Sequence, residues 1–253
     1  MECFGECGKK TSKRCSRCKL VFYCSRACQA KRRHEQLCDF AISNLETIRL
    51  IVAEQAKKFH NTSKPEVKLE CLGHRHNFNL NKATVGPSQI HGTGVFATKD
   101  IEVGEIITMY PPHLCKFIVN NDRHVNGHQM LVYKSAGTPL QYYEDYCGSE
   151  TKELDSYEHM FGSQYSIIGH PLMIDDSNCL AHMINDGAKE FSTKHKYFQS
   201  SHLHSNSQMF GVDNVVIGLM ANKPIKAGDE IISTYGYEYW MTNLNRVKIQ
   251  HLL

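Results

Sequence analysis

The pattern of apolar and polar positions changes twice along this 253-residue chain. Over residues 39–59 the apolar residues recur at steps of three and four, which predicts one helix with an apolar stripe. The stripe consists of Ala41, Leu45, Ile48, Val52, Ala56 and Phe59. Turn-forming residues at 61–65 end the helix. We expect this helix to pack the N-terminal segment against the rest of the chain, or alternatively to receive a partner helix.

From about residue 78 the pattern changes to short β-like runs separated by Gly and Pro. Two segments, 94–107 and 218–232, resemble each other, and each predicts a strand, a turn containing a glycine (Gly104 or Gly228) and a second strand. Similar hairpins near both ends suggest a mostly-β core closed by its C-terminal segment. Residues 111–165 are polar and irregular with several tyrosines, and we expect an insertion with some helix.

The cysteines are distributed unevenly, since seven of the 11 lie within the first 38 residues. This segment contains few large apolar residues, and a core that small cannot order about 40 residues. A dense cluster of cysteines in an intracellular chain favours metal binding, whereas free or disulfide-bonded cysteines are the alternative. Metal binding would supply the stability that apolar burial lacks.

The metal-binding residues occur as four closely spaced pairs, which suit two tetrahedral zinc ions. Residues three or four apart in a turn or helix can direct their side chains at one point. The candidate ligands are Cys3, Cys7, Cys15, Cys18, Cys24, Cys28, His34 and Cys38.

This arrangement of cysteine pairs, followed by His34 and Cys38 at the end, resembles a MYND finger. In that family the pairs interleave, which implies that the first and third pairs share one zinc ion and the second and fourth share the other. MYND fingers mostly bind proteins, and some bind proline-containing peptides. The resemblance therefore implies a peptide partner for residues 1–38.

Three separated stretches of the remaining chain together resemble the SET domain of protein lysine methyltransferases. They are residues 88–97 with Gly92 and Gly94, residues 178–188 with Asn185 and Asp186, and residues 228–240 with Tyr235. With the finger, the chain resembles the SMYD group. The resemblance implies an α+β, mostly-β SET fold of short sheets, with a small zinc-stabilised finger and a linking helix.

The same resemblance implies the site residues and the cofactor, S-adenosylmethionine. Gly92, Gly94, Asn185, Asp186 and Tyr235 would bind the cofactor, with Asn185 on its methionine-like part. Tyr235 would be the catalytic tyrosine. Further residues would support the loop or line the lysine channel: Asn206, Tyr237, Tyr239 and Trp240.

The expected organisation is a finger (1–38), a helical linker (39–77), a SET domain (78–240) and a tail (241–253). Asp186 stands where the family usually has histidine, which keeps open a catalytically silent zinc-finger adaptor on a SET scaffold. The tail or the insertion would have to cover the lysine channel, because no cysteine follows Trp240 to build a closing zinc segment.

Charge and hydropathy limit the remaining classes of function. Residues 1–38 carry ten Lys or Arg and three Glu, although the whole chain has a net charge of only +3. Such a basic segment suits a nucleic acid or an acidic partner, with a solvated surface as the alternative. The chain contains no apolar run long enough to span a membrane and no signal region at its start. We therefore expect an intracellular protein, nuclear or cytoplasmic, without a membrane partner.

Overall fold

The computed structural model describes residues 9, 11–18, 22–31, 34–118, 128–133, 139–143, 157–161 and 164–241. Its helices are α1 (Arg26–Lys31), α2 (His34–His60), α3 (Pro65–Gly73), the short 3-10 helix η3 (Ala181–Met183) and α4 (Lys194–His204). Its strands are β1 (Ala83–Pro87), β2 (Thr93–Ala97), β3 (Ile106–Met109), β4 (Leu114–Ile118), β5 (His128–Tyr133), β6 (Pro139–Tyr143), β7 (Glu158–Phe161), β8 (Tyr165–Ile168), β9 (Asn185–Asp186), β10 (Ser207–Val212), β11 (Val216–Ala221) and β12 (Glu230–Ser233).

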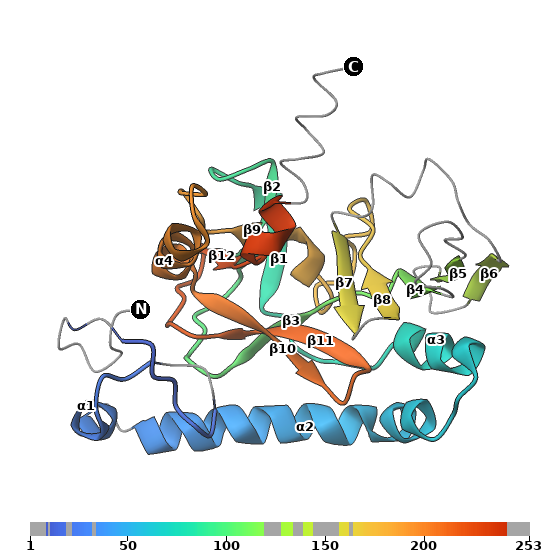
Figure 1. Ribbon diagram of the computed structural model, residues 1–253, viewed down its shortest axis with the longest axis horizontal. Coiled ribbons are helices and arrows are strands. Elements are labelled where there is room, and N and C mark those ends of the chain that lie inside the picture. The colour runs from blue at the N-terminus through green and yellow to red at the C-terminus, as the bar shows by residue number, and fades with distance from the viewer. Residues whose placement is uncertain are drawn as a thin grey trace.

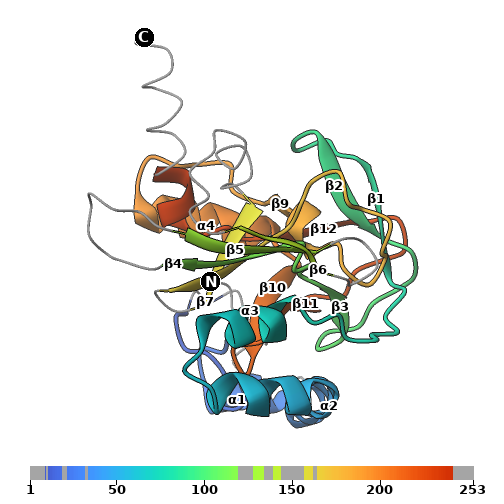
Figure 2. The same ribbon diagram turned by 90° about the vertical axis from the view of Figure 1, so that its right-hand side faces the viewer.

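The strands form three small sheets, with orders β1-β2-β12-β9, β10-β11-β3 and β6-β5-β4-β8-β7. Figure 1 shows α2 running along one side of the molecule beneath β10 and β11. Figure 2, turned by 90°, shows α3 on the same side as α2, below the strands. Short sheets combined with a few helices confirm the α+β class expected from the sequence.

The two similar segments contain their glycine turns but do not form the two hairpins that we expected. Gly104 and Gly228 have φ values of +91° and +88°, so the turns share the left-handed conformation that favours glycine. However, β2 pairs with β12, and β3 pairs with β11. Each segment therefore exchanges its strands with the other.

Hydrogen bonds across this exchange are nearly symmetric. The peptide N–H of Gly104 donates to Ala221 O, and that of Gly228 donates to Ala97 O. Ile101 and Ile225 form a reciprocal antiparallel bridge between the two segments. The expectation of hairpins was wrong because periodicity shows which face of a strand is buried, but not which strand lies beside it.

The helix predicted over 39–59 exists and is longer, since α2 spans His34–His60. Its predicted apolar stripe faces the protein, and all its residues except the half-buried Leu45 are buried. Ala41 lies so close to Gly104 that a Cβ at Gly104 would come within 3.1 Å of the Ala41 side chain. The Asn44 amide donates to Gly104 O at 2.8 Å. The helix therefore packs against the exchanged segments.

Most of the described residues of 111–165 belong to one antiparallel sheet, and the part of this segment where we expected some helix includes residues 144–156, which lie outside the described residues. Strands β4 and β8 pair over four residues, and β7 forms the edge beside β8. Contacts of α3 with β4, β5 and β8 connect this sheet to the helical linker. Among the described residues, no helix has the length and apolar character needed to cross a bilayer.

Candidate functional site

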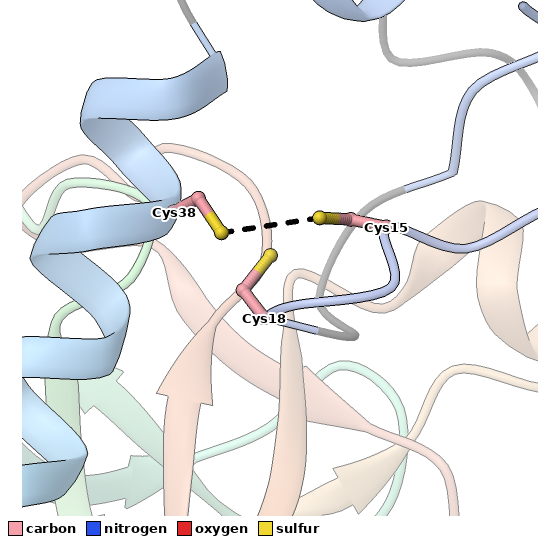
Figure 3. A group of neighbouring side chains, drawn as sticks. All are labelled: Cys15, Cys18 and Cys38. Carbon is pink, nitrogen blue, oxygen red and sulfur yellow. Dashed lines mark hydrogen bonds between the residues drawn. The ribbon is translucent and has the colours of Figure 1, made fainter. Parts of the chain in front are cut away.

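The N-terminal module brings three of the predicted ligands together. The Sγ atoms of Cys15, Cys18 and Cys38 all lie within 4.8 Å of one another, and all three residues are buried. Cys15 and Cys18 lie on one loop, whereas Cys38 projects from α2, and Figure 3 shows their sulfur atoms directed toward one centre. The long helix thus supplies a ligand position to the finger.

The spacing of these sulfur atoms fits zinc. Cys15 Sγ and Cys38 Sγ are 3.9 Å apart. A tetrahedron with Zn–S bonds of 2.3 Å has S···S edges of about 3.8 Å, whereas a disulfide would require about 2.05 Å. Thiolate is also the donor that structural zinc sites use most. The donor set and its geometry therefore suit a zinc ion.

A second pair of cysteines lies apart from this group. Cys24 Sγ and Cys28 Sγ are 3.4 Å apart at the start of α1, so they can share one ion. Their proposed partners, Cys3 and Cys7, lie outside the described residues. His34 begins α2, but its side chain also lies outside the described part. Cys15 and Cys18 (the second pair) therefore lie in a different group from Cys24 and Cys28 (the third pair). Interleaved pairing requires this separation, because it assigns the second and third pairs to different zinc ions.

A second cluster forms where β2, β9 and β12 meet, around the predicted glycine turn. The Asn185 amide nitrogen donates to His91 O at 3.1 Å, to Thr93 O at 3.3 Å and to Glu230 Oε1 at 2.9 Å. A Cβ at Gly94 would approach Glu230 Oε1 to 2.3 Å, so a larger residue there would have to displace the Glu230 carboxylate. Asn185 thus holds the glycine turn, and its amide nitrogen is engaged within the protein.

Gly92 has φ +49°, and a Cβ built there meets no heavy atom within 4 Å. The turn is therefore open at Gly92 and closed at Gly94. Asn206 supports the same corner, because its side chain donates to Glu230 O and accepts from Ile232 N, both at 2.8 Å. These contacts fix β12, which leads into Tyr235.

Asp186, the neighbour of Asn185 in β9, is only 4% exposed. Its carboxylate accepts hydrogen bonds from three parts of the fold, and the donors are Ala188 N, Ser201 Oγ, Tyr197 OH, Tyr235 N and Trp240 Nε1. A carboxylate offers about four lone-pair directions. The side chain is therefore saturated from within the protein, and only the backbone of Asp186 remains for the predicted contact with a cofactor.

Tyr235 lies beside Asn185 and Asp186, as expected from the three stretches. Its hydroxyl donates to Ile184 O at 2.5 Å, and its peptide N–H donates to Asp186 at 3.0 Å. Burial, followed by the neighbouring Tyr239, raises the pKa of Tyr235 well above its usual value. The hydroxyl is therefore neutral at physiological pH.

Other tyrosines surround Tyr235. The Tyr239 ring meets it edge-on, with centroids 4.8 Å apart. Tyr110 and Tyr157 also act on its pKa, and the Tyr110 hydroxyl donates to Tyr157 O. Tyr157 belongs to the 111–165 segment, so a described residue of the insertion reaches this tyrosine cluster.

The remaining predicted wall residues are divided between two positions. The Trp240 ring stacks on Tyr235 with centroids 5.9 Å apart and an interplanar angle of 16°. Tyr237 lies beside Tyr197 of α4, with centroids 5.9 Å apart. Tyr239 and Trp240 therefore contact Tyr235, whereas Tyr237 packs against α4.

A small apolar cavity lies next to the tyrosine cluster but outside the predicted site. It has a volume of about 30 Å³, and its walls include Leu72, His76, Met109 and Tyr110. Such a volume holds about one water molecule. Apart from Tyr110, this cavity is lined by residues away from the glycine turn and Tyr235.

Sequence reasoning missed several residues of this site: Tyr110, Tyr157, Glu230, Tyr197 and Ser201. Tyr197 and Ser201 are four residues apart in α4, a spacing that places both on one helix face. That signal depends on recognising α4, which has no apolar stripe. Tyr110 and Tyr157 carry no local motif, and only their position in the fold links them to Tyr235.

The chain is similar to known proteins in its sequence. One solved structure with similarity is that of a candidate histone methyltransferase from Plasmodium falciparum, 16% identical, covering 63% of this chain and 96% of that chain. Its TM-score of 0.32 is too low to carry an argument. A family model for the MYND finger matches residues 3–38, and one for the SET domain matches residues 92–236, more than half of the chain. The chain therefore belongs to the SET domain family and carries a MYND finger at its N-terminal end.

Proposed function

We propose that this protein is an S-adenosylmethionine-dependent protein lysine methyltransferase whose MYND finger binds a protein or peptide partner. The observation that supports this most is the joining of the Gly92–Gly94 turn, Asn185 and Tyr235 through shared hydrogen bonds and backbone pairing. The first two come from stretches about 90 residues apart, and Tyr235 lies about 50 residues further on.

The cofactor, when bound, supplies a methyl group on a positively charged sulfonium. We assign its binding to the open turn at Gly92, to Gly94 and to the backbone of Asn185 and Asp186. The open side of Gly92 suits this role, because a ligand can approach the backbone there without meeting a side chain.

The acceptor amine must be uncharged before transfer. Removing the proton from a lysine at pH 7 costs about 4.6 kcal/mol, given a pKa near 10.4. The buried tyrosines around Tyr235 lower this cost, because a desolvated ammonium loses its proton more readily. The proton passes to solvent before the methyl group is transferred.

Tyr235 orients the amine rather than removing its proton. Its raised pKa keeps the hydroxyl protonated, and its hydrogen is already donated to Ile184 O. The oxygen lone pairs remain able to accept an N–H from the amine. Aligning two reactants in this way is the main demand of an in-line displacement.

The test compares methylation of a protein lysate with radiolabelled S-adenosylmethionine by the parent and by Tyr235→Phe. We expect a loss of rate on the order of 10²-fold, as for removal of a group that interacts with the transition state. Tyr165→Phe is the matched control, because its ring stacks on Phe117, away from the cluster. Equal rates for the parent and Tyr235→Phe would contradict the assigned role.

Calorimetry with S-adenosylmethionine distinguishes the enzyme from the alternative, a silent adaptor on a SET scaffold. Clear binding supports the enzyme. A parent protein that retains zinc but neither binds the cofactor nor methylates would favour the adaptor.

A further inference from the structure

The Asp186 carboxylate connects three elements that are separate in the chain. It lies in β9 and accepts hydrogen bonds from α4 at 2.5 Å (Tyr197 OH) and 2.8 Å (Ser201 Oγ). It also accepts at 3.0 Å from Tyr235 N and at 2.9 Å from Trp240 Nε1. Tyr235 lies in the turn that leads from β12 into the helical residues 237–241, and Trp240 lies in those helical residues.

The network extends beyond the carboxylate through Tyr197, which is fully buried. The Tyr197 hydroxyl accepts from Gly236 N at 2.9 Å and lies 2.9 Å from Thr234 Oγ1. Thr234, Tyr235 and Gly236 are therefore each held by a polar contact to Asp186 or to its direct partner. Burial, and then the hydrogen bond to Asp186, raises the pKa of Tyr197 to about 12, so its hydroxyl remains a donor.

Three of the five groups around Asp186 are N–H donors (Ala188 N, Tyr235 N and Trp240 Nε1), and the hydroxyls of Tyr197 and Ser201 donate to it as well, so the side chain acts as an acceptor throughout. Asp186 takes part in none of the ion pairs among the described residues. The hydrogen bonds from the protein therefore replace the water that burial removes from its side chain. A buried carboxylate of this kind is tolerated only while those donors remain in place. Displacing any of these donors would leave a buried polar atom of Asp186 without a partner, so the hydrogen bonds hold Asp186 and its donors in one arrangement.

We propose that Asp186 is a positioning residue, which sets Tyr235 and Trp240 through its side chain without that side chain contacting the cofactor. This role rests on the proposed methyltransferase function. It also explains why an aspartate can occupy the position where the family usually has histidine. A neutral imidazole has one acceptor nitrogen and could not receive five donors.

Trp240 makes the proposal measurable without activity, because it is the only tryptophan of the chain. Its indole N–H is bound to Asp186 and its ring stacks on Tyr235. In Asp186→Asn, one carboxylate oxygen is replaced by an NH₂ group, which cannot accept the two or more hydrogen bonds that this oxygen now accepts. We expect Trp240 emission to shift to longer wavelength and its quenching by acrylamide to increase.

The matched control is Asp100→Asn. Asp100 is exposed and accepts hydrogen bonds from Lys226 Nζ at 2.7 Å and Ala227 N at 3.0 Å, far along the chain from Trp240. This variant loses the same charge and should keep the parent emission spectrum and the parent kcat.

Kinetics separate positioning from cofactor contact. We expect Asp186→Asn to lower kcat on the order of ten- to 100-fold, as misplacement of a reacting group does, while the Kd for S-adenosylmethionine stays close to that of the parent. Weakened cofactor binding with unchanged Trp240 emission would overturn the proposal in favour of a direct contact. A lower unfolding temperature with unchanged emission and kcat would overturn it in favour of a structural role alone.

Two milder variants keep the test decisive if Asp186→Asn does not fold, as judged by circular dichroism. Tyr197→Phe and Ser201→Ala each remove one donor from the same carboxylate. The proposal expects a smaller emission shift and a smaller loss of kcat in both, and parent values in both would overturn it. If the parent itself neither binds cofactor nor methylates, the proposed function fails, while the emission of Trp240 still tests its positioning by Asp186.

Discussion

The finger and the SET domain hold their shape by different means. Among the described residues of the finger, the buried hydrophobic ones are four cysteines (Cys15, Cys18, Cys28 and Cys38) and Tyr23. In the SET domain the largest fully buried side chains are, apart from Tyr197, apolar and unbranched or aliphatic, and they include Ile101, Ile107, Met109, Leu219 and Met220. Apolar burial can stabilise the second region but not the first, for which a bound metal must supply the free energy.

Because of this difference, the finger should be sensitive to loss of metal and the SET domain to loss of apolar contacts. The shared element is α2, which contributes Cys38 to the finger and a buried stripe to the main domain. Loss of metal should therefore disorder the finger while leaving the body of α2 attached through residues such as Ile48 and Val52. Loss of apolar contacts should have the opposite effect.

The largest expected effect is the loss of zinc from the finger. Cys38→Ala removes one of three converging thiols, and we expect its zinc content to fall by about one ion per chain relative to the parent. A structural zinc ion contributes about 10–16 kcal/mol in apparent binding free energy, so the finger should become sensitive to protease. Elemental analysis and limited proteolysis provide the measurements.

Cys71→Ala is the control for this variant, because Cys71 is buried in α3, away from the cysteine group. It should retain the parent zinc content. A Cys38→Ala protein that still binds as much zinc as the parent would break the assignment of this ligand.

The next effect concerns the apolar region. Leu219→Ala in β11 empties a position that is 0% exposed, between β10 and β3. We expect a loss of about 2–5 kcal/mol in the free energy of unfolding, measured by urea titration of Trp240 emission, with the zinc content unchanged. Concurrent loss of both zinc ions would show that the two regions are not held independently.

A smaller effect should appear as the pH falls. Burial lowers the pKa of His182 to about 4 and that of His113 to about 3. Their rings lie 5.4 Å apart, with Tyr110, His170 and Arg75 around them.

Because the unfolded chain binds these protons near pH 6.5, the stability that neutral histidines contribute is present above that pH. It is lost as the pH falls toward the folded values. At pH 5 the loss is about 2 kcal/mol for one such histidine.

The double variant His113→Asn, His182→Gln should show a flatter decline in unfolding temperature between pH 7 and pH 5. Asn can still accept from His170 N, the contact that His113 Nδ1 now makes at 2.8 Å. Exposed His195→Gln is the control and should decline like the parent. A double variant as acid-sensitive as the parent would assign the sensitivity to other groups, such as His76, whose pKa burial also lowers to about 4.

The smallest effect concerns the N-terminus of α4. The side chain of Thr193 accepts from Lys196 N at 3.2 Å and caps the helix that carries Tyr197 and Ser201. Thr193→Ala should cost about 1 kcal/mol, measured by thermal unfolding, and Thr193→Ser should restore most of it. No difference between the Ala and Ser variants would show that the cap contributes nothing.

Local spacing was sufficient for several features of this protein. Ligands three residues apart, such as Cys15 and Cys18, can reach one metal ion whatever surrounds them, whereas the convergence of Cys38 on them was implied only by the resemblance to MYND fingers. An apolar stripe at helical spacing likewise specified α2 and its buried face. The glycine turns at 104 and 228 were also recognisable, because a left-handed backbone conformation requires few residue types.

Partners distant in sequence were decided only by the tertiary structure. The paired cysteines and the helix α2 could be recognised from residues near one another in the chain, whereas the fold class and the three stretches of the site were recognised through the resemblance to known families. The sequence alone did not establish that the two similar segments exchange strands, that Tyr110 and Tyr157 join Tyr235, or that Asp186 faces inward. The physical reason is that strand pairing and burial depend on which surfaces meet in the folded protein. The residues of a strand, or the identity of a buried carboxylate, do not specify the distant residues that it will contact.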